Sequence, residues 1–240
     1  MNPKISVITV VYNGVSTIEQ CIVSVINQTY KNKEYIIIDG GSTDGTLDII
    51  KKYEEKITYW ISEPDKGVYD AMNRGISIAK GDYLYFLGSD DFVFEPNSFE
   101  KLINYCNKYY DLIFSKIKYI EGRNVKSTLG IKTLLHNTVH HQSALYNAKL
   151  FTNFRYDTNY MLISDYELNL LIYKGKKKYR FANITLAQCS DGGMSRKQIK
   201  KAIEETNLIR EKVIGKSISL RLIYGCKYLF IKLKNKCCSM

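Results

Sequence analysis

The chain has 240 residues, of which 45% are apolar and 25% charged, so it can bury a sizeable core, and disordered or collagen-like classes are excluded. Its six cysteines include no CxxC pair, which argues against a zinc ribbon or a disulfide scaffold and favours a reducing compartment. The net charge of +11 is uneven, because residues 193–240 carry 12 Lys/Arg against 3 Asp/Glu and the rest of the chain is close to neutral. This asymmetry indicates an anionic partner for the tail, or else a solvated basic face.

The first half of the chain alternates apolar runs with segments of helical character. Strands are expected at 5–12, 34–39, 57–61 and 82–87, and helices at 16–28, 42–53 and 67–80. The residues Ser16–Glu19 form a capping box, which predicts the start of the first helix. This order of elements predicts an α/β fold with an open, mostly parallel twisted sheet and helices on both faces.

The second half has a less regular pattern. Its expected elements are a helix from Pro96 to about Asn107, strands at 111–119, 141–147 and 178–187, and a helix at 164–174. The tail predicts two more helices, one from a capping box at Ser195 with an apolar stripe to Val213, and one over 217–235 with a less regular stripe. No targeting peptide and no apolar stretch of about 18 residues is visible, so we expect no spanning helix.

Polar residues follow each of the four strands expected in the first half. The segments are Tyr12–Gly14, Asp39–Asp44, Glu63–Gly67 and Gly88–Asp91. Because ligands bind at the carboxyl ends of strands in an open α/β sheet, four such ends favour a binding site over turn chemistry alone. The first strand is not followed by GxGxxG and the chain has no GxxxxGK[ST], which disfavours dinucleotide-binding dehydrogenases and P-loop NTPases.

The adjacent carboxylates Asp90 and Asp91 directly follow an expected buried strand. Neighbouring carboxylates repel each other, and a hard divalent cation with oxygen ligands, Mg²⁺ or Mn²⁺, relieves that repulsion. The pair therefore predicts a metal site, with an N-cap for the helix near Pro96 as the alternative.

Together these segments resemble the inverting family 2 glycosyltransferases of GT-A fold. The resemblance rests on ISVITVVYNG (5–14), DGGSTDGT (39–46), PDKGVYDAMNRG (64–75) and GDYLYFLGSDD (81–91). It is close over residues 4–95 and looser to about residue 196, through His141-Gln142 and Gly192–Ser195. Four motifs in the family's order make the resemblance specific, and it implies the GT-A fold and glycosyl transfer from a nucleotide-sugar donor.

The resemblance also implies which residues bind the donor. Residues at the first strand end flank the base and ribose, an acid at the second binds the base (usually uracil), and a loop and helix after the third lie near the diphosphate and sugar. In that order the matching residues are Thr9, Tyr12 and Asn13; Asp39, with Ser42 and Asp44 supporting its loop; and Lys66, Gly67, Asp70 and Asn73.

For the metal and the chemistry, the resemblance implies Asp90 near the donor and Asp91 as the direct ligand of Mn²⁺ or Mg²⁺. The first carboxylate of the family's D-x-D-D is replaced by Gly88 here. Asp165 matches the catalytic base that takes the proton of the acceptor hydroxyl, although the Glu that usually precedes it is Ser164. A plain helix N-cap is the alternative role for Asp165.

Four more residues are candidates for ligand contacts. His141 and Gln142 are expected to contact the acceptor or the diphosphate, with a structural role as the alternative for His141. Tyr69 and Tyr166, which lie in the expected donor loop and beside Asp165, are the tyrosines we expect to stack on sugar.

The predicted function is a metal-dependent inverting glycosyltransferase that moves a sugar, usually from a UDP-sugar, to a lipid-linked glycan acceptor in surface polysaccharide synthesis. We expect a catalytic domain at 1–193, with a donor half at 1–95 and an acceptor half at 96–193, and a basic helical tail at 194–240. The tail is expected to hold the protein on the cytoplasmic face of an anionic membrane, or else to pack on the catalytic domain or a second subunit. The alternative is a non-catalytic nucleotide-sugar or nucleic-acid binding protein, although the tail has no RRM, KH or helix-turn-helix signature and no nucleic acid is expected.

Overall fold

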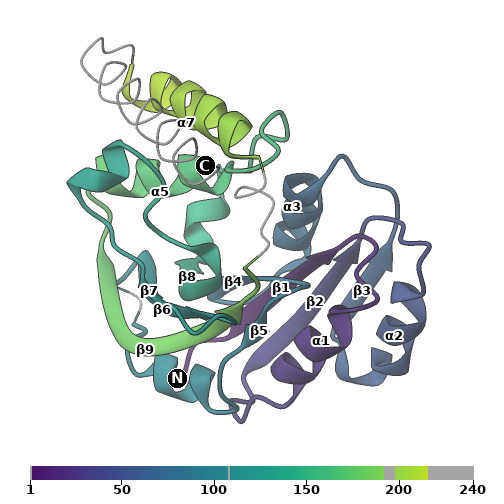
Figure 1. Cartoon of the computed structure of the whole chain (residues 1–240). Coiled ribbons are helices and arrows are strands. Elements are labelled where there is room, and N and C mark those ends of the chain that lie inside the picture. Colours follow the sequence, from purple (N-terminus) through teal and green to yellow (C-terminus); the bar gives the residue numbers. More distant parts are fainter. Residues whose placement is uncertain (1, 108, 192–197, 216–240) are drawn as a thin grey trace.

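The structure, a computed structural model, describes residues 2–107, 109–191 and 198–215 (Figure 1). Within these residues nine strands form one sheet in the order β3-β2-β1-β4-β8-β6-β9-β5, with β7 paired to β6. Helices cover both faces of the first half of the sheet, and the second half curls away from it (Figure 1).

The first half is a parallel sheet built by strand–helix alternation, as predicted. The bounds are β1 (Ile5–Val11), α1 (Ile18–Ile26), β2 (Lys33–Asp39), α2 (Thr46–Lys52), the 3₁₀ turn η1 (Glu54–Lys56), β3 (Tyr59–Ser62), α3 (Val68–Ile78) and β4 (Tyr83–Gly88). From β1 the chain moves outward to β2 and β3, and then returns to place β4 on the other side of β1. The topological switch point therefore lies between β1 and β4, where ligands bind in such sheets.

The second half is mixed rather than parallel. Its elements are β5 (Phe92–Val93), α4 (Ser98–Ile103), β6 (Leu112–Tyr119), β7 (Asn124–Lys126), η2 (Ile131–Leu134), η3 (His141–Ser143), β8 (Ala144–Asn147), η4 (Ala148–Phe151), α5 (Asp165–Lys174) and β9 (Tyr179–Cys189). The strand β8 runs antiparallel to both β4 and β6, whereas β9 is parallel to β6. The expectation of a mostly parallel sheet thus describes the first four strands. The strands β5 and β7 were not predicted, because two or three residues carry no readable periodicity.

Two apolar clusters fill the two faces of the sheet. One packs α1, α2 and α4 against it, and the other packs α3 and α5. Gly75 lets α3 approach the sheet closely, because a Cβ atom there would lie 2.5 Å from Cγ2 of Ile8 in β1. Because β1, β2 and β4 are parallel neighbours, their carboxyl ends lie along one edge of the sheet.

The start of α1 differs from the prediction. The N-cap residue is Thr17, and neither its side chain nor that of Ser16 makes a capping hydrogen bond, so the predicted capping box is wrong. The Thr17 hydroxyl donates instead to the carbonyl of Gly14, at 3.3 Å. The loop after β1 therefore folds back onto the start of the helix and uses the hydroxyl that would have capped it.

The first helix predicted in the tail is present as α7 (Ile199–Ile214) and packs on α5. The contact is apolar, between Tyr166 and Leu170 of α5 and Ile209 and Val213 of α7. The expected boundary near residue 193, the capping box at Ser195, Gly192–Ser195 and the helix over 217–235 lie outside the described residues. Across the described ranges, no helix combines the length and apolar character that crossing a bilayer requires.

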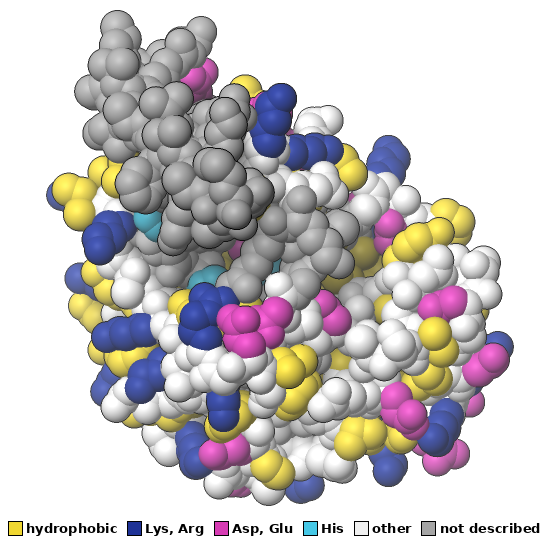
Figure 2. Space-filling view, in the orientation of Figure 1, with side chains coloured by type: hydrophobic (Ala, Val, Ile, Leu, Met, Phe, Trp, Pro, Cys, Tyr) yellow, Lys and Arg dark blue, Asp and Glu magenta, His cyan; other side chains and the backbone are white. Residues whose placement is uncertain are grey.

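Charge is distributed unevenly over the surface. Lys and Arg gather on the left side of Figure 2, which in the orientation of Figure 1 is the region of β6, β7 and β9, whereas acidic and basic groups alternate on the right. In the described structure Lys126, Lys178 and Arg180 of this region are exposed, and each lies over an aromatic ring. This region adds basic surface to a chain whose tail is already basic.

Candidate active site

The loop after β2 is organised by one buried carboxylate. Asp39 is fully buried and accepts hydrogen bonds from the Gly41 and Ser42 amides and from the Ser42 and Ser62 hydroxyls, at 2.5–3.0 Å. Gly41 has φ +86°, a backbone conformation that favours glycine, so the loop can turn tightly around the carboxylate. Asp39 therefore holds the loop. Its side chain exposes no oxygen that could accept the expected hydrogen bond from a nucleotide base.

The loops after β1 and β2 are hydrogen-bonded to each other. Asn13 lies in the left-handed region at φ 50°. Its side-chain oxygen accepts from the backbone amide of Thr43, and its backbone amide donates to the Ser42 hydroxyl at 2.7 Å. Asp44 accepts from the Val15 amide and from Thr46, and the Thr46 hydroxyl is the main cause that holds the pKa of Asp44 below its ordinary value. Asn13, Ser42 and Asp44 therefore support the strand ends, as the sequence predicts for Ser42 and Asp44.

Two residues predicted to flank the nucleotide have different positions. Tyr12 is 66% exposed at the end of β1, which leaves its ring free to contact a ligand. Thr9 is fully buried two residues before the end of β1, and its hydroxyl accepts from Tyr35. The prediction that Thr9 contacts the donor is therefore wrong, because β1 continues past it and its side chain points into the core.

The segment between β3 and α3 contributes backbone more than side chains. Asp70 accepts from the Lys66 amide, and Gly67 takes φ +112° before α3 begins. Asn73 uses both ends of its side-chain amide on the Tyr156 backbone, so it holds the 152–160 loop and does not present a free group to a donor. Lys66, Gly67 and Asp70 follow β3, and their contact with the donor stays a prediction.

Asp90 and Asp91 lie just after β4, at the switch point. Asp91 is only 4% exposed; it accepts from the Gln142 side chain at 2.9 Å and from the Ser190 amide at 3.0 Å. Burial, followed by the charge of Asp90, raises the pKa of Asp91 to about 6. Its carboxylate does not cap α4, whose N-cap is Asn97, so the alternative role as a helix cap is excluded.

The carboxylate pair fits part of a divalent cation site. In the described ranges no group of three or more His, Cys, Asp or Glu is arranged to hold a metal ion by itself. Mg²⁺, however, is commonly held by one or two carboxylates together with substrate phosphates and water. Burial and the charge of Asp90 both disfavour the ionised form of Asp91, and a divalent cation bound beside the pair would offset both effects.

A cavity of about 350 Å³ opens beside this pair. Its lining includes Asp90, Asp91, His141, Gln142 and Asp165, all of them named as candidates from the sequence. The lining thus brings together the metal candidate and the base candidate, which are far apart in the chain. Thr206 of α7 also lines the cavity, so the first helix of the predicted tail contributes to this site.

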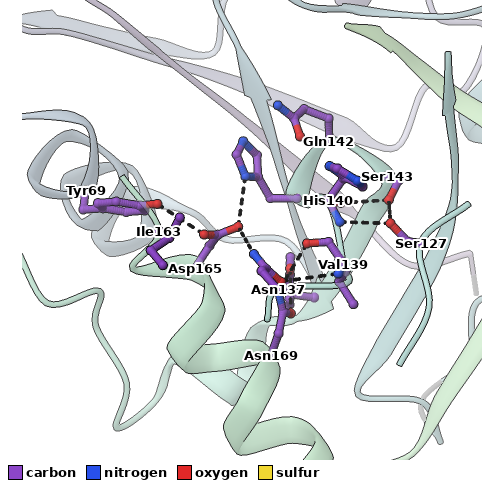
Figure 3. Close-up of polar contacts among 12 residues, drawn as sticks. Tyr69, Ser127, Asn137, Val139, His140, Gln142, Ser143, Ile163, Asp165 and Asn169 are labelled. Atoms are coloured by element: carbon purple, nitrogen blue, oxygen red, sulfur yellow. Dashed lines mark hydrogen bonds and ion pairs between the residues drawn. The ribbon is translucent and has the colours of Figure 1, made fainter. Parts of the chain in front are cut away.

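Asp165 lies at the first residue of α5 and is held by three donors (Figure 3). The Tyr69 hydroxyl donates to Oδ1 at 3.2 Å, the Asn137 amide donates to Oδ2 at 2.9 Å, and Nδ1 of His141 lies 3.3 Å from Oδ2. Burial and the charge of Asp165 raise the pKa of Tyr69 well above its ordinary value, so its phenol stays protonated and donates. No side chain caps α5, which excludes a plain N-cap as the role of Asp165.

The second tier of this network fixes Asn137. Asn169 donates to the side-chain oxygen of Asn137 at 3.0 Å (Figure 3). Asn169 itself accepts from the Tyr146 hydroxyl at 3.0 Å. This arrangement turns the NH₂ group of Asn137 toward Asp165. Asn137, Asn169 and Ser190 were missed by sequence analysis, because single polar residues in irregular or helical segments carry no signal of what they face.

His141 and Gln142 are presented by the short turn η3, immediately before β8. Because β8 is antiparallel to β4, its beginning meets the end of β4, where Asp90 and Asp91 lie. The turn is held by the Ser143 hydroxyl on the His140 carbonyl and by the Ser127 hydroxyl on the His140 amide (Figure 3). Gln142 then bonds Asp91 while His141 bonds Asp165, so neighbouring residues link the two acidic groups.

The two tyrosines expected to stack on sugar do not do so. Tyr69 is 4% exposed and Tyr166 is fully buried, with its hydroxyl donating to the Thr133 carbonyl. Both rings belong to the packing of α3 and α5, and that prediction is wrong.

Comparison with known proteins places the chain in a class. The sequence signature named "Glycosyl transferase family 2" matches residues 6–201, which is most of the chain. The chain belongs to this family. It is a glycosyltransferase, as its motifs predict.

Relatives of this glycosyltransferase carry matching names. A "PGL/p-HBAD biosynthesis glycosyltransferase" of Mycobacterium tuberculosis is 28% identical over 210 residues, covering 83% of this chain and 82% of the relative. An uncharacterized glycosyltransferase of Rickettsia typhi is 34% identical over 185 residues, covering 70% of this chain and 58% of that protein.

Solved structures share the fold at low identity. The S. aureus TarS fragment 1–349, solved also with UDP and with UDP-GlcNAc, has a TM-score of 0.68 at 18% identity and covers 86% of this chain. The mannosyltransferase PcManGT from Pyrobaculum calidifontis, in complex with GDP-Man and Mn²⁺, has a TM-score of 0.70 at 15% identity and covers 90% of this chain. The aligned regions span 65% and 66% of those two chains, and the likeness confirms the predicted GT-A fold.

Proposed function

We propose that this glycosyltransferase moves a sugar from a nucleotide-sugar donor to an acceptor hydroxyl, with inversion at the anomeric carbon and with Mn²⁺ or Mg²⁺ bound. The observation that carries the proposal is the shared cavity of Asp91 and Asp165 at the switch point of the sheet. Two acidic groups in one cavity suit two tasks, one at the leaving diphosphate and one at the attacking hydroxyl.

The donor side of the proposal uses the strand ends. Exposed Tyr12 and the loop that Asp39 holds lie where the base and ribose of a nucleotide would bind. The fold relatives TarS and PcManGT were solved with UDP-GlcNAc and GDP-Man, which supports a nucleotide-sugar donor and leaves UDP as our preferred nucleotide.

The metal side uses Asp91 as the direct ligand, with Asp90 beside it. Donor phosphate oxygens and water would complete the ligand set, since Gly88 replaces the family's first carboxylate. A bound divalent cation supplies neutralisation of the charge on the leaving diphosphate. The protein's own residues hold donor and acceptor in position. A group in the hydrogen-bond network of Asp165 takes the proton of the attacking hydroxyl.

For the acceptor we propose a lipid-linked glycan at the cytoplasmic face of the membrane. The support is charge: residues 193–240 carry a net +9, and further Lys and Arg side chains gather over β6, β7 and β9 (Figure 2). Basic residues near an anionic lipid surface are each worth about 1 kcal/mol of attraction.

A thermal-shift panel tests the donor assignment. UDP, GDP, UDP-GlcNAc and GDP-mannose are each added with Mn²⁺ and, separately, with EDTA. We expect UDP and at least one nucleotide sugar to raise the melting temperature more with Mn²⁺ than with EDTA. No shift with any nucleotide would contradict the proposal.

A further inference from the structure

The atom that takes the proton from the acceptor follows from the way Asp165 is held. Each Asp165 oxygen already accepts at least one hydrogen bond, and its side chain is only 8% exposed. His141, in contact with it, keeps 22% of its side-chain surface exposed and lines the same cavity. Of the two groups, the imidazole is therefore the more accessible to a substrate hydroxyl.

The hydrogen bond to Asp165 also sets the tautomer of His141. An ionised carboxylate only accepts, so Nδ1 of His141 must carry the hydrogen that lies between them. In the neutral ring Nε2 then holds a free lone pair, and Nε2 makes no hydrogen bond to any residue within the described ranges. The same arrangement, a carboxylate that orients a histidine whose other nitrogen accepts a proton, activates nucleophiles in hydrolases.

We propose, resting on the glycosyl transfer proposed above, that Nε2 of His141 is the catalytic base and that Asp165 is its positioning residue. The proton moves from the acceptor hydroxyl to Nε2 as the acceptor oxygen forms its bond to the anomeric carbon. The bond from that carbon to the diphosphate breaks, and its electron pair leaves with the diphosphate. Asp165 then bonds the imidazolium through Nδ1 and balances its charge.

The surrounding charges suit this role. Burial by itself would lower the pKa of His141, but the hydrogen bond and charge of Asp165, and after them the charges of Asp91 and Asp90, raise it above its ordinary value of 6.5. A cation bound at Asp91 would reduce the last contribution and leave that of Asp165. A base with a pKa near the working pH is the most efficient in proton transfer. Tyr69 and Asn137 occupy the remaining contacts of Asp165 and keep its carboxylate turned toward the ring.

The tautomer can be measured without any substrate. The chain has three histidines, His136, His140 and His141, so ¹⁵N NMR of the rings is readily assigned by comparing the wild type with His141→Gln. We expect neutral His141 to carry its proton on Nδ1, with a pKa above 6.5 that falls in Asp165→Asn. A neutral ring protonated on Nε2 would overturn the proposal.

Turnover tests the role itself. Release of UDP from UDP-GlcNAc and of GDP from GDP-mannose is followed against pH with Mn²⁺ and water as acceptor, for wild type, His141→Gln, His141→Ala and the control His136→Gln. We expect the wild-type rate to fall below a pKa above 6.5, His141→Gln to lose about 100-fold or more with unchanged donor affinity, and added imidazole to restore part of the His141→Ala rate. The control should keep the wild-type pH profile.

Two results would overturn the assignment. One is a His141→Gln rate within threefold of wild type. The other is a loss of donor affinity equal to the loss of rate, which would make His141 a contact of the diphosphate. A chain that binds neither donor would instead contradict the proposed function, and the NMR tautomer would still decide how the His141–Asp165 pair is arranged.

Discussion

The strand ends proposed to bind the donor are held by hydrogen bonds within single loops and between the neighbouring loops after β1 and β2. The cavity beside them is held by residues from several elements that are distant in the sequence. Asp39 bonds Gly41 and Ser42, and Asp44 bonds Thr46, within single loops. In the cavity, Asp165 bonds Tyr69 and Asn137, and Asp91 bonds groups that lie 51 and 99 residues away. Hydrogen bonds within a loop fix the shape of that loop for a ligand. Hydrogen bonds between distant elements bring together Asp91 and Asp165, which are far apart in the chain.

This contrast predicts that mutations in the two regions fail differently. Changes in the cavity should remove chemistry while leaving the donor loops intact. Changes in the loops after β1 and β2 should weaken nucleotide binding and lower stability, because the side chains there hold the loops by hydrogen bonds.

The largest effect is expected for Asp91→Asn. Loss of the charge that holds the cation should reduce nucleoside diphosphate release by about a thousandfold, since metal catalysis contributes several kcal/mol. It should also remove the Mn²⁺ enhancement of nucleotide affinity in a titration. Turnover like wild type would show that Asp91 is not the metal ligand.

Asp91→Asn should lose activity but gain stability. In the folded protein the pKa of Asp91 is raised to about 6. The free energy of unfolding is therefore at its full value below the unfolded pKa near 3.8, and it decreases as the pH rises through 6. Asp91→Asn avoids this loss and should unfold with a free energy higher by about 1–3 kcal/mol at pH 7. Denaturant unfolding at pH 4 and pH 7 checks it: the two proteins should differ at pH 7 and converge toward pH 4.

Asp165→Asn comes next in size. Asparagine keeps the shape of the side chain, but it neither balances an imidazolium nor accepts a proton. We expect transfer to fall by about two orders of magnitude or more while donor affinity stays the same. Equal loss of donor binding, measured by titration with UDP and Mn²⁺, would place Asp165 on the donor side and remove the contrast between the regions.

In the loop after β2 the expected effects are smaller and concern nucleotide binding. Asp39→Ala leaves two backbone amides and two hydroxyls without their acceptor, so nucleotide affinity should fall by roughly 1.5–3 kcal/mol, with a loss of stability. The matched control Ser62→Ala removes one donor and should cost about 0.5–1.5 kcal/mol. An unchanged dissociation constant in Asp39→Ala would contradict a role of this loop in donor binding.

The smallest effect concerns the tail beyond α7. Truncation after Gly215 keeps α7, whose Ile209 and Val213 pack on α5, and removes the basic residues that follow. We expect the full chain to float with anionic vesicles in low salt and release in high salt, and the truncated chain to stay in solution and still cleave donor. Binding of the full chain to neutral and anionic vesicles alike would argue against an electrostatic attachment.

Much of the first half could be predicted because its pattern is local. The apolar runs of β1, β2 and β4 and the loop motif at Asp39 are each contained in a short stretch of sequence. The cavity could be predicted only as separate candidates, Asp91, His141 and Asp165. Their meeting depends on β8 running antiparallel to β4, which no spacing in the sequence reveals.

The errors have the same origin. Thr9 and Tyr69 belong to motifs that suggested ligand contact, but tertiary packing buries both side chains. The role of Asn137 was missed because its meaning comes from Asn169 and Asp165, which follow it in the chain by about thirty residues.

Release of nucleoside diphosphate from a donor tests most directly whether this glycosyltransferase uses a cation held by Asp91. UDP-GlcNAc and GDP-mannose are each incubated with the full chain in Mn²⁺ and in EDTA, with Asp91→Asn beside it. We predict release from at least one donor in Mn²⁺, loss of that release in EDTA, and loss in Asp91→Asn. Binding of the donors with no release under any condition, or release that is equal in EDTA, would contradict it.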